Sequence, residues 1–285
     1  MLLYYKYTPI KDPHAVMLWQ KSLCERLELK GRIIIAEEGI NGTVEGIKEN
    51  TMLYMREMKQ YEPFKKISYK KSAGTGKSFK KLSVKVRKDI VSDKVAEWGV
   101  NPNEVTGKYL SVEELHEWIT QKKKFYIIDM RNDYEHKSGY FEHSILPPME
   151  NFRDLPKILP SLQNLEDIPI VTVCTGGVRC EKASGFLIKH GFKHVYQLEG
   201  GIVTYMEKYP NQDFKGKLYV FDERILMGFE TDSVEHEVIG KCIKCGVSSE
   251  KYVNCRNDRC HRHVICCGKC VDEDGMIVCP GGCRS

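Results

Sequence analysis

The pattern of apolar and polar positions predicts an α+β domain in the first hundred residues. Residues 2–7 form an apolar strand pattern, and residues 13–29 place their apolar side chains on one helical face behind Asp12, a suitable N-cap. The segments that follow predict a strand over 31–36, a turn over 39–42, a strand over 43–46, a helix over 51–59 and a strand over 79–88. This βαββαβ order is that of a ferredoxin-like sandwich, which we assign to residues 1–100.

The middle of the chain carries continuous apolar runs, which are typical of strands buried on both faces. These runs span residues 125–129, 170–173 and 194–198, and the clearest helical pattern between them spans 180–190. Ser111 with Glu114 fits a capping box that opens a further helix. The alternation predicts an α/β domain with a parallel sheet over residues 108–215, after a linker marked by Asn101-Pro102-Asn103 and Gly107.

The last part of the chain, residues 216–285, has a different composition. One further strand is expected over 217–221, and beyond Gly240 no apolar run is long enough to build a core. Nine of the twelve cysteines lie between Cys242 and Cys283. Eight of them form four closely spaced pairs: Cys242 and Cys245, Cys255 and Cys260, Cys267 and Cys270, Cys279 and Cys283.

Paired thiols at this spacing favour structural zinc, because each short turn supplies two soft ligands to a tetrahedral site. Eight thiols suggest two sites. The pairs could be joined in a cross-braced order, first with third and second with fourth, or sequentially, and the sequence does not choose between the two. A segment with so few apolar residues is expected to need the metal to fold.

The chain is expected to be cytoplasmic. The first residues lack the basic and apolar regions of a secretory signal, and no membrane-spanning segment is visible. In that compartment cysteines serve metal binding and catalysis more often than disulfides. The net charge of +5 is mild, and nothing in the sequence indicates an oligomeric state.

The strongest candidate for catalysis is the loop Cys174-Thr175-Gly176-Gly177-Val178-Arg179-Cys180, which follows the apolar run at 170–173. A cysteine between a buried strand and a helix N-terminus, near a guanidinium, is set up to ionise and act as a nucleophile. We therefore predict Cys174 as the nucleophile and Arg179 as the cation that stabilises it. Cys180 is either a resolving thiol or a small residue at the helix start. The Cys-x4-Arg spacing is one residue shorter than the Cys-x5-Arg loop that holds phosphate, which argues against a phosphatase.

This loop resembles the active-site loop of rhodanese-type sulfurtransferases. The resemblance extends to Asp129-Met130-Arg131 with Glu135 and Gly139-Tyr140-Phe141, where Tyr140 replaces the usual His, and to the turn Leu198-Glu199-Gly200-Gly201. Asp129 and Arg131 are expected to brace the loop. Three matches in the right order imply a rhodanese domain in the middle of the chain.

The chain as a whole is similar to the rhodanese-like tRNA uridine-34 hydroxylases. The similarity includes the segment Ala36-Glu37-Glu38-Gly39-Ile40-Asn41-Gly42-Thr43, the loop extended through Glu181-Lys182-Ala183-Ser184, and residues 216–224. It implies an oxidoreductase that uses molecular oxygen as co-substrate to form 5-hydroxyuridine at position 34 of tRNA, with the loop cysteine required. Two alternatives stay open: a sulfurtransferase that cycles Cys174 through a persulfide, and a non-catalytic tRNA-binding adaptor.

A basic stretch supports a nucleic acid partner. Residues 65–88 contain ten Lys and Arg and no acidic residue, with aromatic side chains among them. Such a segment can neutralise phosphates and stack on unpaired bases, although charge runs are often only solvated surface. We predict contact with the tRNA anticodon loop through Lys77, Lys80, Lys81, Lys85 and Arg87.

Overall fold

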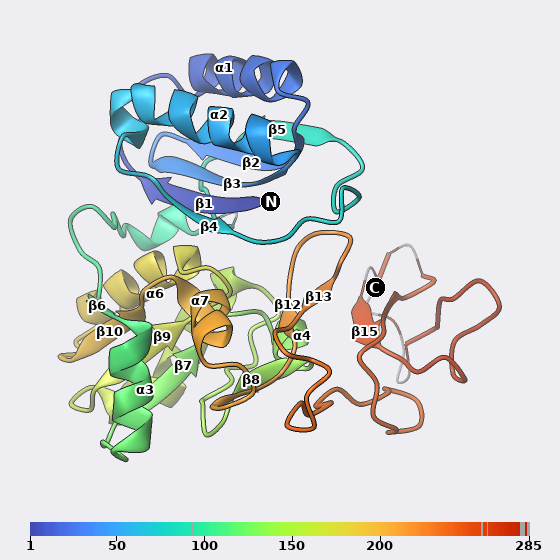
Figure 1. The fold of residues 1–285 in the computed structure, drawn as a ribbon. Coiled ribbons are helices and arrows are strands. Elements are labelled where there is room, and N and C mark those ends of the chain that lie inside the picture. The colour runs from blue at the N-terminus through green and yellow to red at the C-terminus, as the bar shows by residue number, and fades with distance from the viewer. Residues whose placement is uncertain (93, 258, 261, 280–282, 284–285) are drawn as a thin grey trace.

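The computed structural model describes residues 1–92, 94–257, 259–260, 262–279 and 283 of the chain. Figure 1 shows an N-terminal domain above a middle domain, with the C-terminal segment beside the middle domain. No helix within these described ranges is long and apolar enough to cross a membrane.

The N-terminal domain is a five-stranded sheet with two helices on one face. The strand order is β4-β1-β3-β2-β5, and only the pairing of β2 with β5 is parallel. Its elements are β1 (Leu2–Tyr7), α1 (Pro13–Arg26), β2 (Lys30–Ala36), β3 (Gly39–Glu45), α2 (Lys48–Gln60), η1 (Glu62–Phe64), β4 (Ser68–Lys71) and β5 (Leu82–Val86). The helices cover the upper face, so the opposite face of the sheet is turned toward the middle domain (Figure 1). The predicted α+β sandwich is confirmed.

The closing strand of that sandwich is not the one expected from the sequence. We expected residues 79–88 to close the sheet, but β4 takes this place beside β1, and β5 adds a fifth strand on the far edge beside β2. β4 has the sequence SYKK and no buried residue, so it carries no apolar signal. Tertiary pairing with β1 makes it a strand.

The glycines expected to form a hairpin turn lie inside a strand instead. Gly39 is the first residue of β3, and its backbone lies so close to β1 that a Cβ there would be 2.1 Å from the carbonyl oxygen of Lys6. β3 is hydrogen-bonded on both sides, to β1 and to β2, and the true turn consists of Glu37 and Glu38. The glycines serve close strand packing rather than the turn.

The middle domain is built on a parallel sheet of four strands in the order β6-β10-β9-β7. The strands and the longer helices are β6 (Lys108–Leu110), α3 (Val112–Thr120), β7 (Tyr126–Asp129), β9 (Ile170–Val173), α6 (Val178–Lys189), β10 (Val195–Leu198) and α7 (Gly201–Lys208). One buried cluster joins α6 to the sheet and a second joins α3 and α7 to its other face. Helices on both faces of a parallel sheet confirm the predicted α/β domain, and the predicted capping box at Ser111 opens α3.

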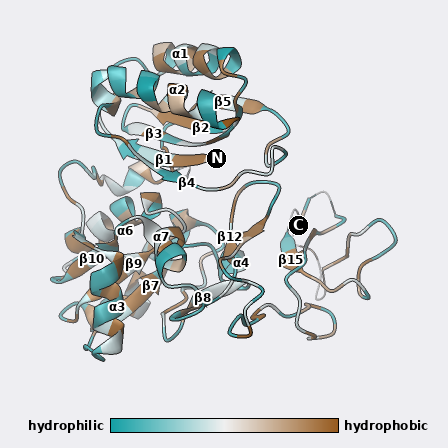
Figure 2. Ribbon diagram, in the orientation of Figure 1, coloured by the Kyte–Doolittle hydropathy of each residue, from teal (hydrophilic) through white to brown (hydrophobic). Residues whose placement is uncertain are grey.

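Short elements complete the middle domain and lead out of it. They are η2 (Ala96–Trp98), α4 (Asp133–His136), β8 (Gly139–Phe141), η3 (Phe152–Asp154), α5 (Leu155–Ile158), η4 (Leu159–Leu165) and β11 (Phe214–Gly216). β11 pairs with β8 and so ties the chain leaving the domain back onto it. Figure 2 shows brown, apolar residues on the central strands of both domains and teal residues on the outer helix faces.

The C-terminal segment has little regular structure. It contains the hairpin of β12 (Leu218–Tyr219) with β13 (Leu226–Met227), and the pair of β14 (Tyr252–Asn254) with β15 (His263–Ile265). Its buried cluster consists mainly of cysteines, together with Val253, Val264 and Ile277. The tyrosines Tyr219 and Tyr252 pack with Tyr134 of the middle domain, which anchors the segment there.

Candidate active site at a cleft between two domains

The Cys174 loop lies at the carboxyl end of β9, between that strand and α6. Gly177 adopts a φ of +101° at the start of the helix, and its amide donates to Cys174 Sγ at 3.2 Å. Such a turn directs backbone N–H groups at the sulfur, where they favour negative charge. The loop therefore forms a cradle for an anion centred on the thiol.

The environment of Cys174 favours the thiolate. Burial alone would raise the pKa of the thiol, but hydrogen bonding from Cys180, the charge of Arg179 and the amides of both residues outweigh it, and the pKa falls to about 5. Burial and the neighbouring Cys174 raise the pKa of the Cys180 thiol. Of these two buried thiols, Cys174 is the one that carries a charge near neutral pH.

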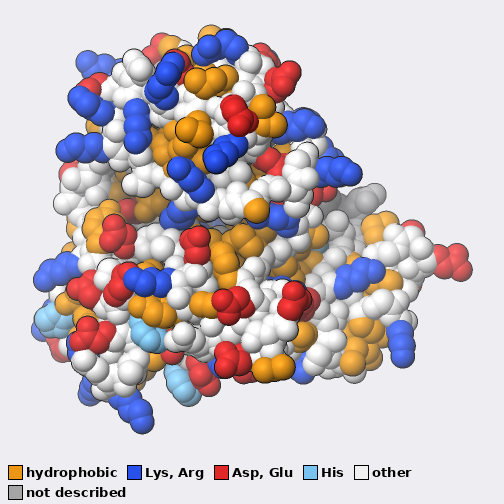
Figure 3. Space-filling view, viewed as in Figure 1, with side chains coloured by type: hydrophobic (Ala, Val, Ile, Leu, Met, Phe, Trp, Pro, Cys, Tyr) orange, Lys and Arg blue, Asp and Glu red, His pale blue; other side chains and the backbone are white. Residues whose placement is uncertain are grey.

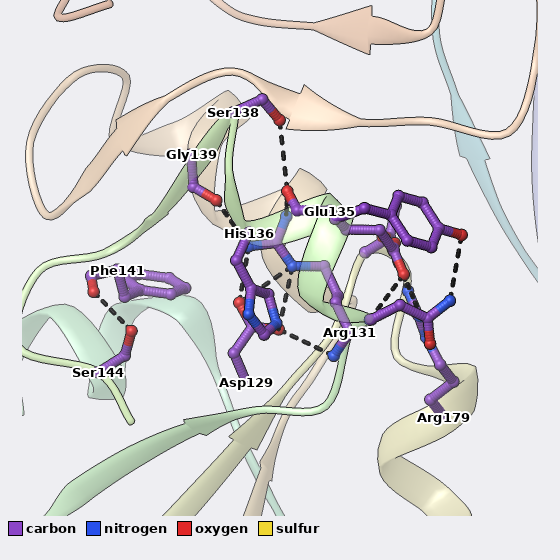
Figure 4. Close-up of polar contacts among 12 residues, drawn as sticks. Asp129, Arg131, Glu135, His136, Ser138, Gly139, Phe141, Ser144 and Arg179 are labelled. Carbon is purple, nitrogen blue, oxygen red and sulfur yellow. Dashed lines mark hydrogen bonds and ion pairs between the residues drawn. The ribbon is translucent and has the colours of Figure 1, made fainter. Parts of the chain in front are cut away.

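Arg179 is engaged by a carboxylate that the sequence analysis left without a role. Its guanidinium forms a two-pronged ion pair with Glu135, with nitrogen–oxygen distances of 2.6 and 2.9 Å (Figure 4). It also donates to Thr175 Oγ1 at 3.2 Å and lies over the ring of Phe221, 5.9 Å from its centroid. Since Glu135 neutralises this cation, Arg179 helps to fix the loop and leaves the cleft without a free charge at this point.

A second buried ion pair supports Glu135 from below. Arg131 has no exposed surface and binds both oxygens of Asp129, at 2.6 and 3.0 Å through separate nitrogens. It also donates to the carbonyl of Gly139 at 2.8 Å (Figure 4). Asp129 and Arg131 thus hold the short helix that carries Glu135, as a bracing role requires.

The turn before α7 packs directly against the back of the loop. The amides of Ile202 and Val203 donate to the carbonyls of Cys174 and Thr175 at 2.9 and 3.1 Å. Gly201 adopts a φ of +72°, and a Cβ there would lie 2.7 Å from the carbonyl oxygen of Cys174. The close contact requires glycine at this position.

The N-terminal domain covers the front of the loop. Because side chains alternate along a strand, β1 directs Leu3, Tyr5 and Tyr7 toward the middle domain. The Tyr7 hydroxyl donates to the carbonyl of Val178 at 3.2 Å, and Tyr5 donates to Glu181 at 3.1 Å. From β4, the ammonium of Lys70 donates to the carbonyl of Gly176.

Ion pairs fasten the two domains beside the loop. Lys182 is almost fully buried, and its ammonium lies 2.5 Å from Glu38 and 3.7 Å from Asp89 of the N-terminal domain. Glu38 lies in the turn between β2 and β3, and Lys182 lies one turn into α6. Two segments that are far apart in the sequence therefore meet at this interface.

A cleft of about 890 Å³ lies between the sheet of the N-terminal domain and the loop. Cys174 and Arg179 contribute to its floor. Figure 3 shows the recess between the two domains, and Lys and Arg side chains spread over the N-terminal domain. Four of its cations line the cleft: Lys6, Arg32, Lys66 and Lys70. The aromatic side chains that line it include Tyr5, Phe79, Tyr109 and Phe221.

The five cations predicted to bind RNA lie elsewhere. Their side chains are exposed, they do not line the cleft, and Lys80 lies 3.7 Å from Glu223. These five are Lys77, Lys80, Lys81, Lys85 and Arg87. That these five residues contact RNA stays a prediction, and such a contact would lie at the edge of the domain, outside the cleft.

The paired cysteines of the C-terminal segment gather in two clusters that could hold metal ions. Cys242, Cys245, Cys267 and Cys270 place their sulfurs within 4.8 Å of one another, as do Cys255, Cys260 and Cys283. Cys279 Sγ lies 3.9 Å from Cys260 Sγ and so joins the second cluster. The first pair thus meets the third and the second meets the fourth, which is the cross-braced order.

The spacing of the sulfurs tests whether zinc would fit. A tetrahedral zinc with bonds of about 2.3 Å to sulfur separates its ligands by about 3.8 Å. The distances are 3.7 Å from Cys245 to Cys267 and 3.5 Å from Cys255 to Cys283. Cys266 is buried next to Cys242 but outside both sets. The first cluster fits the metal in number, chemistry and distance, and the second brings three sulfurs into that range with Cys279 beside Cys260.

Some residues of the site were not singled out from the sequence. Glu135 was noticed only as part of a motif, and Lys70 was one cation among ten. Tyr5 looked like an ordinary strand residue. The signal that could have identified Tyr5 is alternation along β1, because the preceding residue, Tyr4, packs into the core of the domain. That signal requires knowledge of which face of the sheet meets the other domain. For Lys70 the sequence of β4 offers no such signal.

Comparison with family models divides the chain in the same order as the fold. Residues 1–90 match the UPF0176 acylphosphatase like domain, residues 111–208 the rhodanese-like domain and residues 215–284 the domain described as rhodanase C-terminal. A rhodanese-like domain from Anabaena sp. is similar to 39% of this chain and 80% of that chain, with 20% identity and a TM-score of 0.33.

Two relatives are similar over nearly the whole chain. A protein of Staphylococcus saprophyticus named tRNA uridine(34) hydroxylase is 44% identical over 99% of this chain and 88% of its own. A protein of the same name from Arthrobacter sp. is 41% identical over 100% of this chain and 98% of its own.

Proposed function

Because this chain belongs to the tRNA uridine(34) hydroxylase family, we propose that it hydroxylates uridine 34 of tRNA to 5-hydroxyuridine, with molecular oxygen as co-substrate and Cys174 as the essential thiol. The observation that carries the proposal is the near full-length similarity to two relatives of that name. Its place of action would be the cytoplasm, where tRNA is used.

The cleft supports this substrate. Its volume of about 890 Å³ falls in the range of pockets that hold small ligands, so a single nucleotide can enter it. Bases of an anticodon loop are unpaired and can turn outward onto aromatic side chains, while the neighbouring phosphates meet cations. Lys6, Arg32 and Lys66 line the cleft where such phosphates would lie.

Two zinc ions are proposed as structural parts of the C-terminal segment. The four-thiol sets described above would hold them, and zinc would supply cross-links in place of an apolar core. Neither cluster lines the cleft, so no catalytic role is proposed for the metal.

The test is to measure the product in tRNA from cells that lack this gene and carry either the wild-type chain or the Cys174→Ser variant. The wild type should restore 5-hydroxyuridine and the variant should not. Purified enzyme supplied with oxygen-18 gas should place the label in the product. A wild type that leaves tRNA unmodified would refute the proposal.

Persulfide transfer is a second candidate, because an ionised cysteine in a Cys-x4-Arg loop suits it as well. It predicts sulfur transfer from thiosulfate without tRNA, and a stable sulfur adduct on Cys174. Mass spectrometry of the intact protein after incubation with thiosulfate separates the two candidates when it is run beside the oxygen-labelling assay.

RNA binding should depend more on the cleft cations than on the edge cations. Arg32→Glu and Lys66→Glu together place two negative charges where phosphates are proposed to lie, and they should weaken tRNA binding and reduce its dependence on salt. The matched control is Lys81→Glu with Lys85→Glu, two exposed cations, one directly before the edge strand β5 and one within it. If both double variants lose the same tRNA affinity, the edge cations predicted from the sequence also contact RNA.

A further inference from the structure

Three charged groups compete to be the partner of an anion formed at Cys174, and two of them are already neutralised. Arg179 is paired with Glu135 through two contacts. Lys182 is paired with Glu38 and faces Asp89. Lys70 has no ion pair among the described residues, and its ammonium donates a hydrogen bond to the carbonyl of Gly176.

The position of Lys70 follows from the pairing of β4. Tyr69 packs on Tyr4 in the core of the N-terminal domain, with ring centroids 5.2 Å apart. The next residue must point to the opposite face, which carries Lys70 over the loop. Its ammonium lies 3.8 Å from where a Cβ of Gly176 would be, and both residues line the cleft with Cys174.

The surroundings of Lys70 are consistent with a cation held for an incoming negative charge. Burial lowers its pKa to about 8, against the opposing influence of the two cysteines and Glu199. A half-buried ammonium without an ion pair is costly to keep, and such groups are more common at sites of chemistry than in scaffolds.

We infer that Lys70 is a catalytic residue of the hydroxylation, and that it binds the charged oxygen of a uracil ring to which the Cys174 thiolate has added. This inference rests on the proposed function. It adds a covalent substrate adduct and the residue that stabilises it.

The step is balanced without any further reagent. The sulfur of Cys174 forms a bond to C6 of uracil, and the π bond between C5 and C6 breaks. Its electron pair forms a π bond between C4 and C5, while the π pair of the C4 carbonyl moves onto O4. The charge of the thiolate becomes the charge of an enolate, and no proton leaves. The ammonium of Lys70 then donates to O4, and C5, where the hydroxyl group is to be placed, becomes the nucleophilic carbon of the enolate.

Placing this cation on the N-terminal domain also has a chemical reason. Uracil must lie between the loop and the sheet for its C6 to meet the sulfur, so a group that contacts O4 must come from the wall opposite the loop or from its rim. β4 forms that rim. A fixed charge aimed at a developing oxyanion stabilises the transition state more than the substrate.

The experiment uses full-length tRNA transcripts that carry 5-fluorouridine at position 34, with the intact enzyme. Fluorine at C5 withdraws electrons and makes C6 more electrophilic, so the adduct should accumulate. After an acid quench that protonates the enolate, it should appear as a protein–tRNA species of combined mass. The wild type should form it and Cys174→Ser should not. Lys70→Met should slow adduct formation and 5-hydroxyuridine formation roughly 100-fold, as removal of one donor to an oxyanion does, while tRNA affinity stays nearly unchanged.

Two matched variants test whether Lys70 acts in catalysis, rather than by holding the two domains together or by its positive charge alone. Tyr7→Phe removes another contact between the N-terminal domain and the loop, without changing charge. Lys71→Met removes the neighbouring cation on β4, which is exposed and does not line the cleft. Both should form the adduct at nearly the wild-type rate. Lys70→Arg, which keeps the charge, should recover part of the rate.

The outcomes distinguish this inference from the proposed function. If the wild type hydroxylates tRNA but forms no adduct, or if Lys70→Met matches the wild type, the inference is wrong and the function stands. If Tyr7→Phe loses as much as Lys70→Met, the lysine serves only to hold the domains together and the inference is wrong. If the wild type does not hydroxylate tRNA, both are wrong.

Discussion

Cys174 combines full burial with a charge, and its neighbours account for both. Its backbone carbonyl is held by Ile202, its sulfur accepts from Gly177, and the pKa of its thiol is lowered to about 5. Arg179, the cation expected to do most of this from the sequence, shares its charge with Glu135. A buried ion pair of that kind fixes geometry more than it supplies net attraction.

The ionisation of Cys174 can be followed by the ultraviolet absorbance of the thiolate, taken as the difference between wild type and Cys174→Ser. Since the pKa is lowered, the thiolate should persist through neutral pH and disappear only as the pH falls through about 5. Cys180→Ala removes a hydrogen bond to the sulfur and should move this transition to higher pH. A transition near pH 8.5, as for a free cysteine, would contradict the assignment.

At the scale of elements, the order of strands and helices was predictable, and their packing was not. The middle domain was expected from continuous apolar runs, and all three of them became strands of its sheet. The Cys174 loop could be identified because its chemistry is local in sequence. β4 could not be identified, because SYKK has no period that favours a strand. The residues it places over the loop were missed for the same reason.

Adding a single methyl group to the turn before α7 tests whether this turn supports the Cys174 loop. Gly201→Ala adds a Cβ that would lie 2.7 Å from the carbonyl oxygen of Cys174, in a backbone with φ of +72°. Gly191→Ala is the control, because its φ is +95° and no atom lies within 4 Å of the added Cβ. Both should lose roughly 1 kcal/mol or more of stability through backbone strain.

Only Gly201→Ala should also lose activity, since it alone displaces the loop. Thermal unfolding and hydroxylation of tRNA measure the two effects separately. Equal activity in both alanine variants would show that the loop does not depend on this contact.

At the scale of the whole molecule, the cysteine-rich segment is joined to the active site through tyrosines. Tyr252 donates to the carbonyl of Tyr134 at 2.5 Å, and Tyr134 precedes Glu135, the partner of Arg179. The hairpin of β12 and β13 adds Phe221 above the same guanidinium. The segment thus braces the site from beside the middle domain (Figure 1).

Metal content and activity should therefore fall together. The wild type should contain two zinc ions per chain, and Cys245→Ser and Cys260→Ser should each lose one, because each belongs to a different cluster. Cys266→Ala should keep both, since Cys266 lies outside the two sets. Elemental analysis counts the metal, and hydrogen exchange at β14 and β15 reports the folding of the segment. Two zinc ions retained in Cys245→Ser would contradict the ligand assignment.

The site is assembled from both ends of the chain, which has a consequence for its biosynthesis. Tyr5 and Lys70 leave the ribosome long before Cys174, and Phe221 leaves after it. A nascent chain that already displays its nucleophile still lacks the ring over Arg179 and both cysteine clusters. Full activity is therefore expected only after synthesis has passed the last cysteines, so an incomplete chain near the anticodons of translating tRNAs would remain inactive.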